Sequence, residues 1–484
     1  MRGTPDDARC TIIPPYLLRA LAESSDPDVA ASAVETLEHD ATLRARRQGL
    51  PGMAPAPAPP PEQAPEPGGP DAPQRVVSDA RGTQKLPGTV VRREGEPATG
   101  DLAADEAYDG LGATWQLFST AYGRNSLDGR GLPLLATVHY GRDYDNAFWD
   151  GTQMVFGDGD GRYFRRFTAS LDVIGHELAH GVTELTAGLT YRGQSGALNE
   201  SVSDVFGSLV RQRVLGQRAD EADWLIGADL FTDAVQGVAL RSMKAPGTAY
   251  DDPALGRDPQ PAHMDDYVET TDDNGGVHIN SGIPNHAFYL AATAIGGYAW
   301  EGAGRVWYAV LTGPGISADC EFATFAGLTV DAARAQHGVG SPVARAVETA
   351  WQHVGVLRAG APGAPAPREP AVAEPAPAER EGAAGGQEPG RGTEVLVRRT
   401  GGLAGLTRER AVRLEELSRE DADQWSHLLA HRRLSAFADG PSHPDAYCYE
   451  VRCDAPPTRV SMHEPRLPDE VRELLERTLS SRAD

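Results

Sequence analysis

Two stretches rich in proline and alanine constrain the fold of this chain more than any other feature. From 51 to 73, 10 of 23 residues are proline, and a second stretch rich in alanine, proline, glutamate and glycine runs from about 359 to 392. Such segments cannot bury a core and behave as extended linkers. We therefore expect linkers at 51–74 and 358–392, which separate ordered pieces at 1–50, 75–357 and 393–484.

Length and charge narrow the class of protein. A chain of 484 residues exceeds what one hydrophobic core usually organises, so several folding units are expected. The formal net charge of -24 argues against nucleic acid or an anionic membrane as the main partner. The four cysteines are too few and too scattered for a disulfide framework.

Targeting signals are the next consideration. No stretch approaches the roughly 18 apolar residues of a membrane span, and no apolar region precedes Pro14. We therefore expect no membrane partner and no classical secretion signal, which leaves a cytoplasmic location or non-classical export open.

The N-terminal piece opens with an apolar segment at 12–18. A helix is expected from the starting signal Ser25, Asp26 and Pro27. Its predicted apolar face carries Val29, Ala33, Val34 and Leu37. The piece is too small to be stable alone, so it is expected to dock on another part of the chain.

The central piece changes character near residue 170. Before it, the sequence is strand-like and rich in turns, with predicted strands around 90–91 and 137–140. After it, helices are predicted at 171–187, ending at Gly188, and at 197–215, ending at Gly216. Strands followed by helices predict an α+β fold with a cleft between two lobes. The C-terminal piece reads as a small, separate α+β domain.

The predicted helix at 171–187 carries the sequence HELAH at 176–180. Histidines four residues apart lie on one face of a helix, where His176 and His180 can share a tetrahedral metal ion. Glu177 would then lie beside the open coordination position. Taken alone, the pentapeptide also arises by chance on exposed helices.

The following helix supplies the missing ligand. The sequence NESVSD at 199–204 presents Glu200 and Asp204 on one face, as a third ligand and a carboxylate that accepts the free N–H of a ligand histidine. Two acids four apart are, by themselves, usually a solvated face. Three protein ligands leave a fourth position for water, which is typical of catalytic zinc. In that arrangement Glu177 is the general base that takes a proton from the water.

These motifs resemble the thermolysin family of zinc metallopeptidases over roughly 75–357, and the resemblance implies a β-rich lobe and a helical lobe with the zinc cleft between them. Upstream, NAFWDG at 146–151 and MVFGDG at 154–159 look like the family's substrate-binding edge strand and the turn after it. The resemblance implies that the Asn146 side chain and the Ala147 backbone hold the main chain of the substrate.

Downstream, DNGGVHINSG at 273–282 matches the segment with the family's transition-state histidine. The resemblance implies that His278, oriented by Asp273, stabilises the oxyanion together with the Tyr191 hydroxyl. It also implies that Arg241 grips the carbonyl just past the scissile bond. The positions that line the adjoining pocket in the family hold Phe164, Val173, Ile226 and Leu240. Cleavage on the N-terminal side of bulky apolar residues is therefore expected.

Calcium sites common in the family look lost. Asp172 and Asp223 are present, but the matching positions of a paired calcium site otherwise hold Arg211, Leu225 and Ala228. Val238 stands where a second site would need an aspartate. We expect one catalytic zinc ion and little calcium dependence.

The two outer pieces resemble regulators. IPPYLL at 13–18 is similar to the short propeptide of protealysin-like members, which implies that 1–50 lies in the cleft and is removed by a cut near 51–75. RRTGGLAG at 398–405 and PDE at 468–470 resemble emfourin, an inhibitor of such enzymes. The implied partners are peptide substrates and two intramolecular inhibitors, the propeptide and the domain at 393–484.

Three functions remain to be weighed. The first is a monomeric zinc endopeptidase made as a self-processed precursor and, by family analogy, secreted. The second is a regulatory or binding protein whose cleft stays occupied, which the intact Glu177 and His278 disfavour. The third is a zinc hydrolase for substrates other than peptides, which Asn146, Ala147 and Arg241 disfavour. The natural substrate and the propeptide cleavage site do not follow from the sequence.

Overall fold

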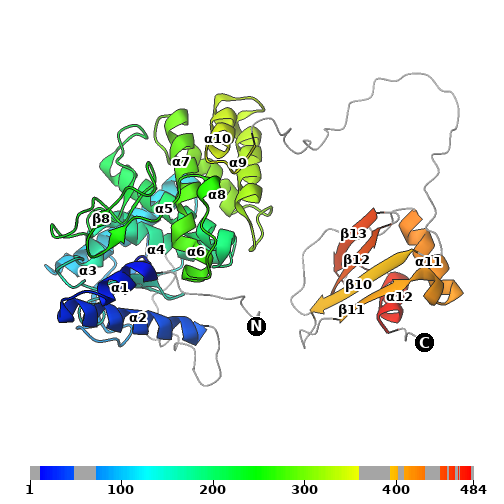
Figure 1. Cartoon of the computed structure of the whole chain (residues 1–484), viewed down its shortest axis with the longest axis horizontal. Helices are drawn as coiled ribbons and strands as arrows, with labels where there is room; N and C mark the ends of the chain where they lie inside the picture. The colour runs from blue at the N-terminus through cyan, green and yellow to red at the C-terminus, as the bar shows by residue number, and fades with distance from the viewer. Residues whose placement is uncertain are drawn as a thin grey trace. The chain divides into compact units, whose positions relative to one another are not determined.

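The computed structural model describes residues 11–47, 72–358, 393–401, 408–430, 447–454, 457–463, 467 and 469–480. The described residues fall into two compact units, one from 11 to 358 and one from 393 to 480, which are described separately below (Figure 1). The linkers predicted at 51–74 and 358–392 fall almost entirely outside the described residues, as do 1–10 and 48–50. The domain boundaries given above therefore stay predictions.

One five-stranded sheet forms the first lobe of the larger unit. Its strands are β1 (Arg75–Asp79), β2 (Thr89–Arg93), β3 (Leu134–Val138), β4 (Ala147–Trp149) and β5 (Met154–Phe156), in the order β2-β1-β3-β5-β4. β1, β3 and β5 run parallel, whereas β2 and β4 pair antiparallel to their neighbours. β4 is thus an edge strand whose outer side can accept another extended segment.

A long helix, α3 (Leu102–Tyr122), interrupts this strand-rich region and corrects the expectation that everything before residue 170 is strand and turn. Asp101 caps its start by accepting a hydrogen bond from the Ala104 amide at 3.0 Å, and Gly123 ends it in the left-handed conformation. Its apolar face, which includes Leu111, is buried. Both caps are visible in the sequence, so the helix was predictable.

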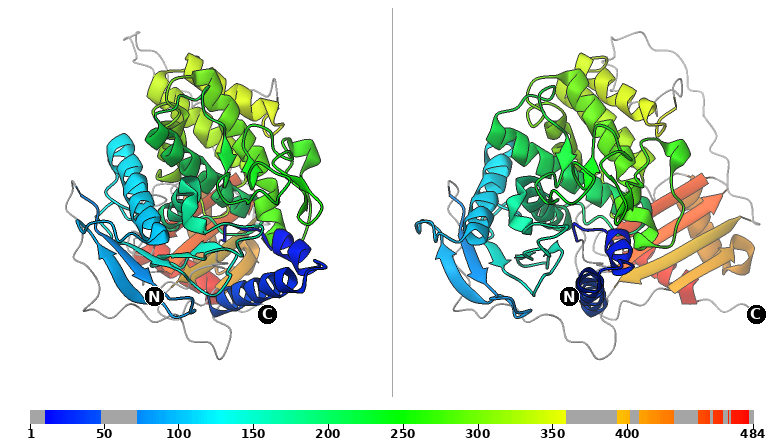
Figure 2. Two further views of the ribbon diagram at one scale, coloured as in Figure 1. Left: turned by 90° about the vertical axis from the view of Figure 1, so that its left-hand side faces the viewer. Right: turned by 60° about the vertical axis from the view of Figure 1, so that its left-hand side comes forward.

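The second lobe is helical, as expected. Its helices are α4 (Leu171–Glu184), α5 (Gly193–Leu215), α6 (Asp273–Asn280), α7 (Gly282–Ile295), α8 (Ala303–Leu311), α9 (Phe322–His337) and α10 (Pro342–His353). Two short ribbons, β6 (Leu225–Ile226) with β7 (Arg241–Ser242) and β8 (Asp251–Asp252) with β9 (Gly256–Arg257), lie between α5 and α6 in the chain. Figure 2 shows the strand-containing lobe in blue and cyan beside the helical lobe in green.

The predicted helix ends are close to the observed ones. α4 stops at Glu184 rather than at 187, and α5 begins at Gly193 rather than at 197. Both helices approach each other so closely that a Cβ on Gly207 would lie 2.3 Å from the Asp172 carbonyl oxygen. Glycine at this position therefore lets α5 bring its side chains against those of α4.

The N-terminal piece forms two helices, α1 (Pro15–Ala22) and α2 (Pro27–Arg47), and docks on the central piece as expected (Figure 1). Leu17, Leu18 and Leu21 of α1 belong to the same buried core as the two lobes of the central piece. One detail was wrong: Val34, assigned to the apolar face of α2, is 43% exposed.

The C-terminal unit has its own sheet and core. The strands β10 (Glu394–Gly401), β11 (Arg408–Arg413), β12 (Tyr447–Asp454) and β13 (Pro457–His463) pair antiparallel in the order β11-β10-β12-β13. α11 (Arg419–Ala430) and α12 (Asp469–Ser480) share this core, where the Trp425 indole donates to the Thr478 hydroxyl at 3.0 Å. Among all described residues, no helix has the length and apolar character needed to cross a bilayer.

Candidate metal centre and active site

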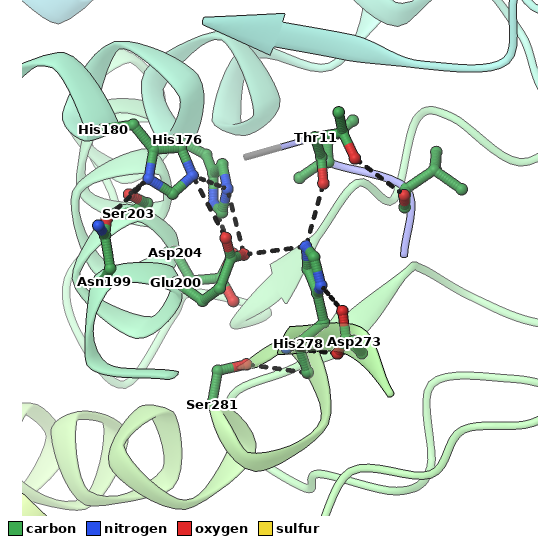
Figure 3. A network of polar contacts seen from close by, with 12 residues as sticks. Thr11, His176, His180, Asn199, Glu200, Ser203, Asp204, Asp273, His278 and Ser281 are labelled. Atoms are coloured by element: carbon green, nitrogen blue, oxygen red, sulfur yellow. Dashed lines mark hydrogen bonds and ion pairs between the residues drawn. The ribbon is translucent and has the colours of Figure 1, made fainter. Parts of the chain in front are cut away.

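Three potential metal ligands meet where α4 and α5 pack. The Nε2 atoms of His176 and His180 lie 3.0 Å apart, and each lies 3.5–3.6 Å from a carboxylate oxygen of Glu200. All three side chains are buried (Figure 3). The sequence-predicted ligand set is therefore brought together by the fold.

Hydrogen bonds at the far side of each ring fix both histidines. The Nδ1 of His176 donates to Asp204 Oδ1 at 2.8 Å, as expected. The Nδ1 of His180 lies 2.8 Å from Asn199 Oδ1 and 3.0 Å from Ser203 Oγ, a pair of contacts that the sequence analysis missed. The sequence signal was present, because both partners flank Glu200 in the same helical motif. With Nδ1 protonated, each Nε2 carries a lone pair.

The donor set fits a divalent cation. Two Nε2 lone pairs that face each other at 3.0 Å repel unless a cation lies beside them. The buried Glu200 Oε2 and Glu177 Oε1 have no hydrogen-bond partner, although buried carboxylate oxygens normally have one. Two imidazoles and one carboxylate form a ligand set that zinc accepts, with a fourth position left open.

Asp204 is the hub behind these ligands. Besides holding His176, it accepts a bidentate pair from Arg241, with Nε to Oδ2 at 2.9 Å and Nη2 to Oδ1 at 2.7 Å. Asn285 on α7 donates to Oδ2 at 2.8 Å. Burial alone would raise the pKa of Asp204, but the charge of Arg241 and the hydrogen bond from His176 hold it well below its usual range. Neither Asn285 nor the Arg241 pair was foreseen.

His278 is presented by an unusual turn. Four residues at the start of α6, from Asp273 to Gly276, have left-handed backbone angles. This turn lets Asp273 bind both the His278 amide at 2.9 Å and its Nδ1 at 2.6 Å. Burial would lower the pKa of His278, but the Asp273 charge outweighs it and raises the value to about 9. The ring is therefore protonated near neutral pH and can donate from Nε2.

Tyr191 lies between His278 and the ligand cluster. Its hydroxyl is 3.2 Å from His278 Nε2 and donates to Glu200 Oε1. The hydroxyl and the imidazole ring thus lie next to each other beside Glu200, and the bond from the hydroxyl to Glu200 was not foreseen.

Glu177 is fully buried beside the cluster. Its Oε2 accepts a hydrogen bond from the Trp149 amide of β4 at 3.1 Å, whereas its Oε1 has no hydrogen-bond partner in the protein. Burial and then the nearby charge of Glu200 raise the pKa of Glu177 well above its usual value. A carboxylate in this environment has a strong tendency to take up a proton.

The predicted substrate-binding groups contact the protein's own N-terminal segment. The Ala147 carbonyl accepts from the Ile12 amide at 3.2 Å, and Asn146 Oδ1 accepts from the Ile13 amide at 3.0 Å. Arg241 Nη1 donates to the Ile12 carbonyl at 3.3 Å. An extended segment therefore pairs with the edge strand β4.

The expected pocket residues are all in the core. Phe164, Val173, Ile226 and Leu240 are at most 2% exposed and belong to one apolar cluster with Ile12. Their role as walls of a substrate pocket stays a prediction.

Comparisons with known proteins agree with this geometry. The sequence profile described as "Thermolysin metallopeptidase, catalytic domain" matches residues 74–184, and the one described as "Thermolysin metallopeptidase, alpha-helical domain" matches 187–356. The profile described as "Emfourin" matches residues 397–479.

Individual relatives and a solved structure also match the chain. An extracellular metalloprotease of Pectobacterium carotovorum subsp. carotovorum is 52% identical over 349 residues, which cover 72% of this chain and 96% of the relative. A thermolysin of Alicyclobacillus acidocaldarius subsp. acidocaldarius is 39% identical over 288 residues, 57% of this chain and 50% of the relative. The solved precursor of protealysin from Serratia proteamaculans superposes with a TM-score of 0.65 at 52% identity, covering 72% of this chain and 100% of that one.

Proposed function

The chain belongs to the thermolysin family of zinc metallopeptidases and is a metalloendopeptidase, and we propose that it cuts peptide bonds on the N-terminal side of bulky apolar residues. In this proposal His176, His180 and Glu200 hold one zinc ion. Glu177 is the general base, and His278 and Tyr191 stabilise the oxyanion.

The chemistry divides among these side chains. Zinc, when bound, would polarise the substrate carbonyl and lower the pKa of water. Glu177 takes the proton of the attacking water and passes it to the leaving nitrogen. His278 and Tyr191 donate hydrogen bonds to the oxygen on which negative charge develops. Asn146, Ala147 and Arg241 hold the main chain on the leaving-group side.

One observation carries the proposal: an extended peptide already lies on the candidate substrate groups. Ile12 and Ile13 use their main-chain amides and carbonyls to bind Ala147, Asn146 and Arg241. A cleft for sugars or small esters has no need for such strand-like pairing. These contacts therefore favour peptide substrates over the third alternative named above.

The test is hydrolysis of casein and of a blocked Gly-Leu-amide by the zinc-loaded chain after removal of its N-terminal piece. Glu177→Ala should lose nearly all activity while still binding zinc. The exposed Glu301 gives a matched control, and Glu301→Ala should retain the wild-type rate. Normal turnover by Glu177→Ala would refute the assignment of the general base. A zinc-loaded, trimmed chain that cuts neither substrate would favour the occupied-cleft alternative.

Calcium independence is a further part of the proposal. Arg211 lies among the acids of the expected paired site, with Nη1 3.2 Å from Asp172 and 3.0 Å from Asp229, and Nη2 3.7 Å from Asp223. A guanidinium inside an acidic cluster supplies the positive charge that calcium would bring. This arrangement supports low affinity for calcium at that position.

Regulation and location complete the proposal. The N-terminal piece covers the substrate groups, which supports an inactive precursor that is activated by a cut near 51–75. The C-terminal domain would act as an intramolecular inhibitor, a role suggested by its match to emfourin. The extracellular relative supports secretion by analogy, and we propose that the enzyme acts as a monomer.

A further inference from the structure

The N-terminal segment crosses the ligand cluster with one of its own peptide bonds at the reacting position. The Thr11 carbonyl oxygen accepts a hydrogen bond from His278 Nε2 at 3.1 Å (Figure 3). That same Nε2 lies 3.6 Å from Glu200. The oxygen of the Thr11–Ile12 bond therefore already occupies the place toward which His278 Nε2 points.

The three main-chain polar groups that follow this bond all form hydrogen bonds with the central piece. The Ile12 amide donates to Ala147, the Ile12 carbonyl accepts from Arg241, and the Ile13 amide donates to Asn146, at 3.2, 3.3 and 3.0 Å. Thr11 pairs antiparallel with Phe148 of β4. The Thr11 carbonyl, the Ile12 amide and carbonyl, and the Ile13 amide are thus all held by residues assigned to the active site.

The side chain that follows the bond has the chemistry that the site is proposed to prefer. Ile12 is bulky, apolar and 0% exposed, and it lies in the core cluster that contains Phe164, Val173 and Leu240. The segment therefore satisfies the substrate requirements in both main chain and side chain.

We propose that Thr11–Ile12 is a self-processing site, hydrolysed by the chain's own active site; this inference rests on the function proposed above. Water adds its hydroxyl to the Thr11 carbonyl carbon, and the C–N bond to Ile12 breaks. Glu177 carries one water proton to the Ile12 nitrogen, and the second follows when the new Thr11 carboxylic acid ionises, which leaves a carboxylate on Thr11 and an α-ammonium on Ile12. No other reactant is needed.

This cut does not release the rest of the N-terminal piece. α1 keeps Leu17, Leu18 and Leu21 buried after the bond is broken. Asp40 of α2 still accepts hydrogen bonds from Asn146 Nδ2 at 2.9 Å and from the Tyr144 hydroxyl at 2.6 Å. Cleavage at 11–12 is therefore a step separate from the activating cut near 51–75, and the nicked chain stays blocked.

The test follows the N-terminus of the full-length chain by intact mass and N-terminal sequencing. The chain is purified with a chelator present and is then supplied with zinc. We expect a new N-terminus at Ile12, formed at a rate that does not change on dilution, and no such product from Glu177→Ala. Ile12→Ala should slow this cut at least about 10-fold, whereas Ile12→Leu should cut within about 10-fold of wild type.

Two results separate this inference from the proposed function. If residues 1–11 stay attached while the same preparation, once trimmed, hydrolyses added peptide, the self-processing site is wrong and the endopeptidase stands. If neither the added peptide nor the chain itself is cut, both the self-processing site and the proposed endopeptidase function are wrong. The position of the Thr11–Ile12 bond in the site can also be tested in a variant that cannot cut it. In Glu177→Ala the Ile12 and Ile13 amides should exchange hydrogen slowly, and fast exchange would overturn the inference.

Discussion

At the scale of single residues, Asp204 links a candidate metal ligand to a group proposed to bind substrate. Its carboxylate holds the Nδ1 of His176 and also forms the bidentate pair with Arg241, whose remaining nitrogen reaches the Ile12 carbonyl. All three side chains are buried, so water cannot replace a lost partner. One carboxylate therefore positions both a candidate metal ligand and the arginine that is proposed to bind substrate.

Replacing this carboxylate by its amide tests the link. Asp204→Asn removes the negative charge that orients the ligand histidine, so zinc affinity should fall about 10–100-fold, measured by competition with a chromogenic chelator. Asp220→Asn, at an exposed acid, is the matched control and should leave affinity unchanged. Wild-type zinc affinity in Asp204→Asn would contradict the role given to this side chain.

At the scale of elements, Arg211 joins α5 to the start of α4 and to the loop beyond α5. Its partner Asp172 is completely buried, and burial raises the pKa of this acid while the Arg211 charge opposes the rise. Breaking such a pair leaves a buried charge without compensation. The guanidinium thus links acidic side chains that a calcium ion would otherwise link.

Arg211→Met should therefore destabilise the chain by about 3–5 kcal/mol, seen as a lower melting temperature. Arg218→Met, at an exposed pair with a 3.7 Å separation, should change it little. Calcium added to the wild type should not shift the melting temperature. A rise with calcium would show that the acids bind the ion despite Arg211.

A second link between elements depends on pH. His139, just after β3, bonds Asp158 and the α3 cap Asp101, each at 2.9 Å. Its hydrogen bond to Asp158 is the main cause that raises the pKa to about 9, from an unfolded value of 6.5, against the effect of partial burial. The charged pairs therefore contribute fully below pH 6.5, and this stability is lost as pH rises through 9.

His139→Asn isolates this contribution, because asparagine tolerates the left-handed backbone found at residue 139. The variant should melt at a lower temperature than the wild type at pH 6, and the two melting curves should converge as the pH passes 9. A difference that stays constant over that range would show that the pair with Asp158 and Asp101 is not its source.

Local sequence patterns predicted the contacts within one helix or between two successive helices. They did not predict contacts between residues that are far apart in the sequence. Helical spacing was enough to bring together His176, His180 and Glu200, because α4 and α5 are neighbours in the sequence. The Asn285 contact with Asp204 joins residues 81 positions apart, and no local pattern marks it. The helix α3 was missed for another reason. Its capping residues Asp101 and Gly123 are recognisable in the sequence, but the turn-rich segments on either side led to a prediction of strands and turns.

At the scale of the whole molecule, the linker predicted at 358–392, here called the tether, bears on how strongly the proposed inhibitory domain would act. The structure shows two units with separate cores, and a flexible linker between two partners gives an effective concentration of about the mM range. A domain that inhibits its own catalytic unit then acts at a strength that does not change on dilution, whereas the same domain added separately must compete at its actual concentration.

This difference between a tethered and a separately added domain can be tested by measuring rates at several dilutions. With the N-terminal piece removed, a chain lacking 393–484 should hydrolyse added peptide faster than the chain that keeps this domain, and dilution should not narrow the gap. Cutting an engineered protease site in the tether should raise the rate only on dilution, and adding the isolated domain should lower it again in proportion to occupancy. Equal rates with and without 393–484, together with no inhibition by the isolated domain, would show that the match to emfourin carries no inhibitory role here.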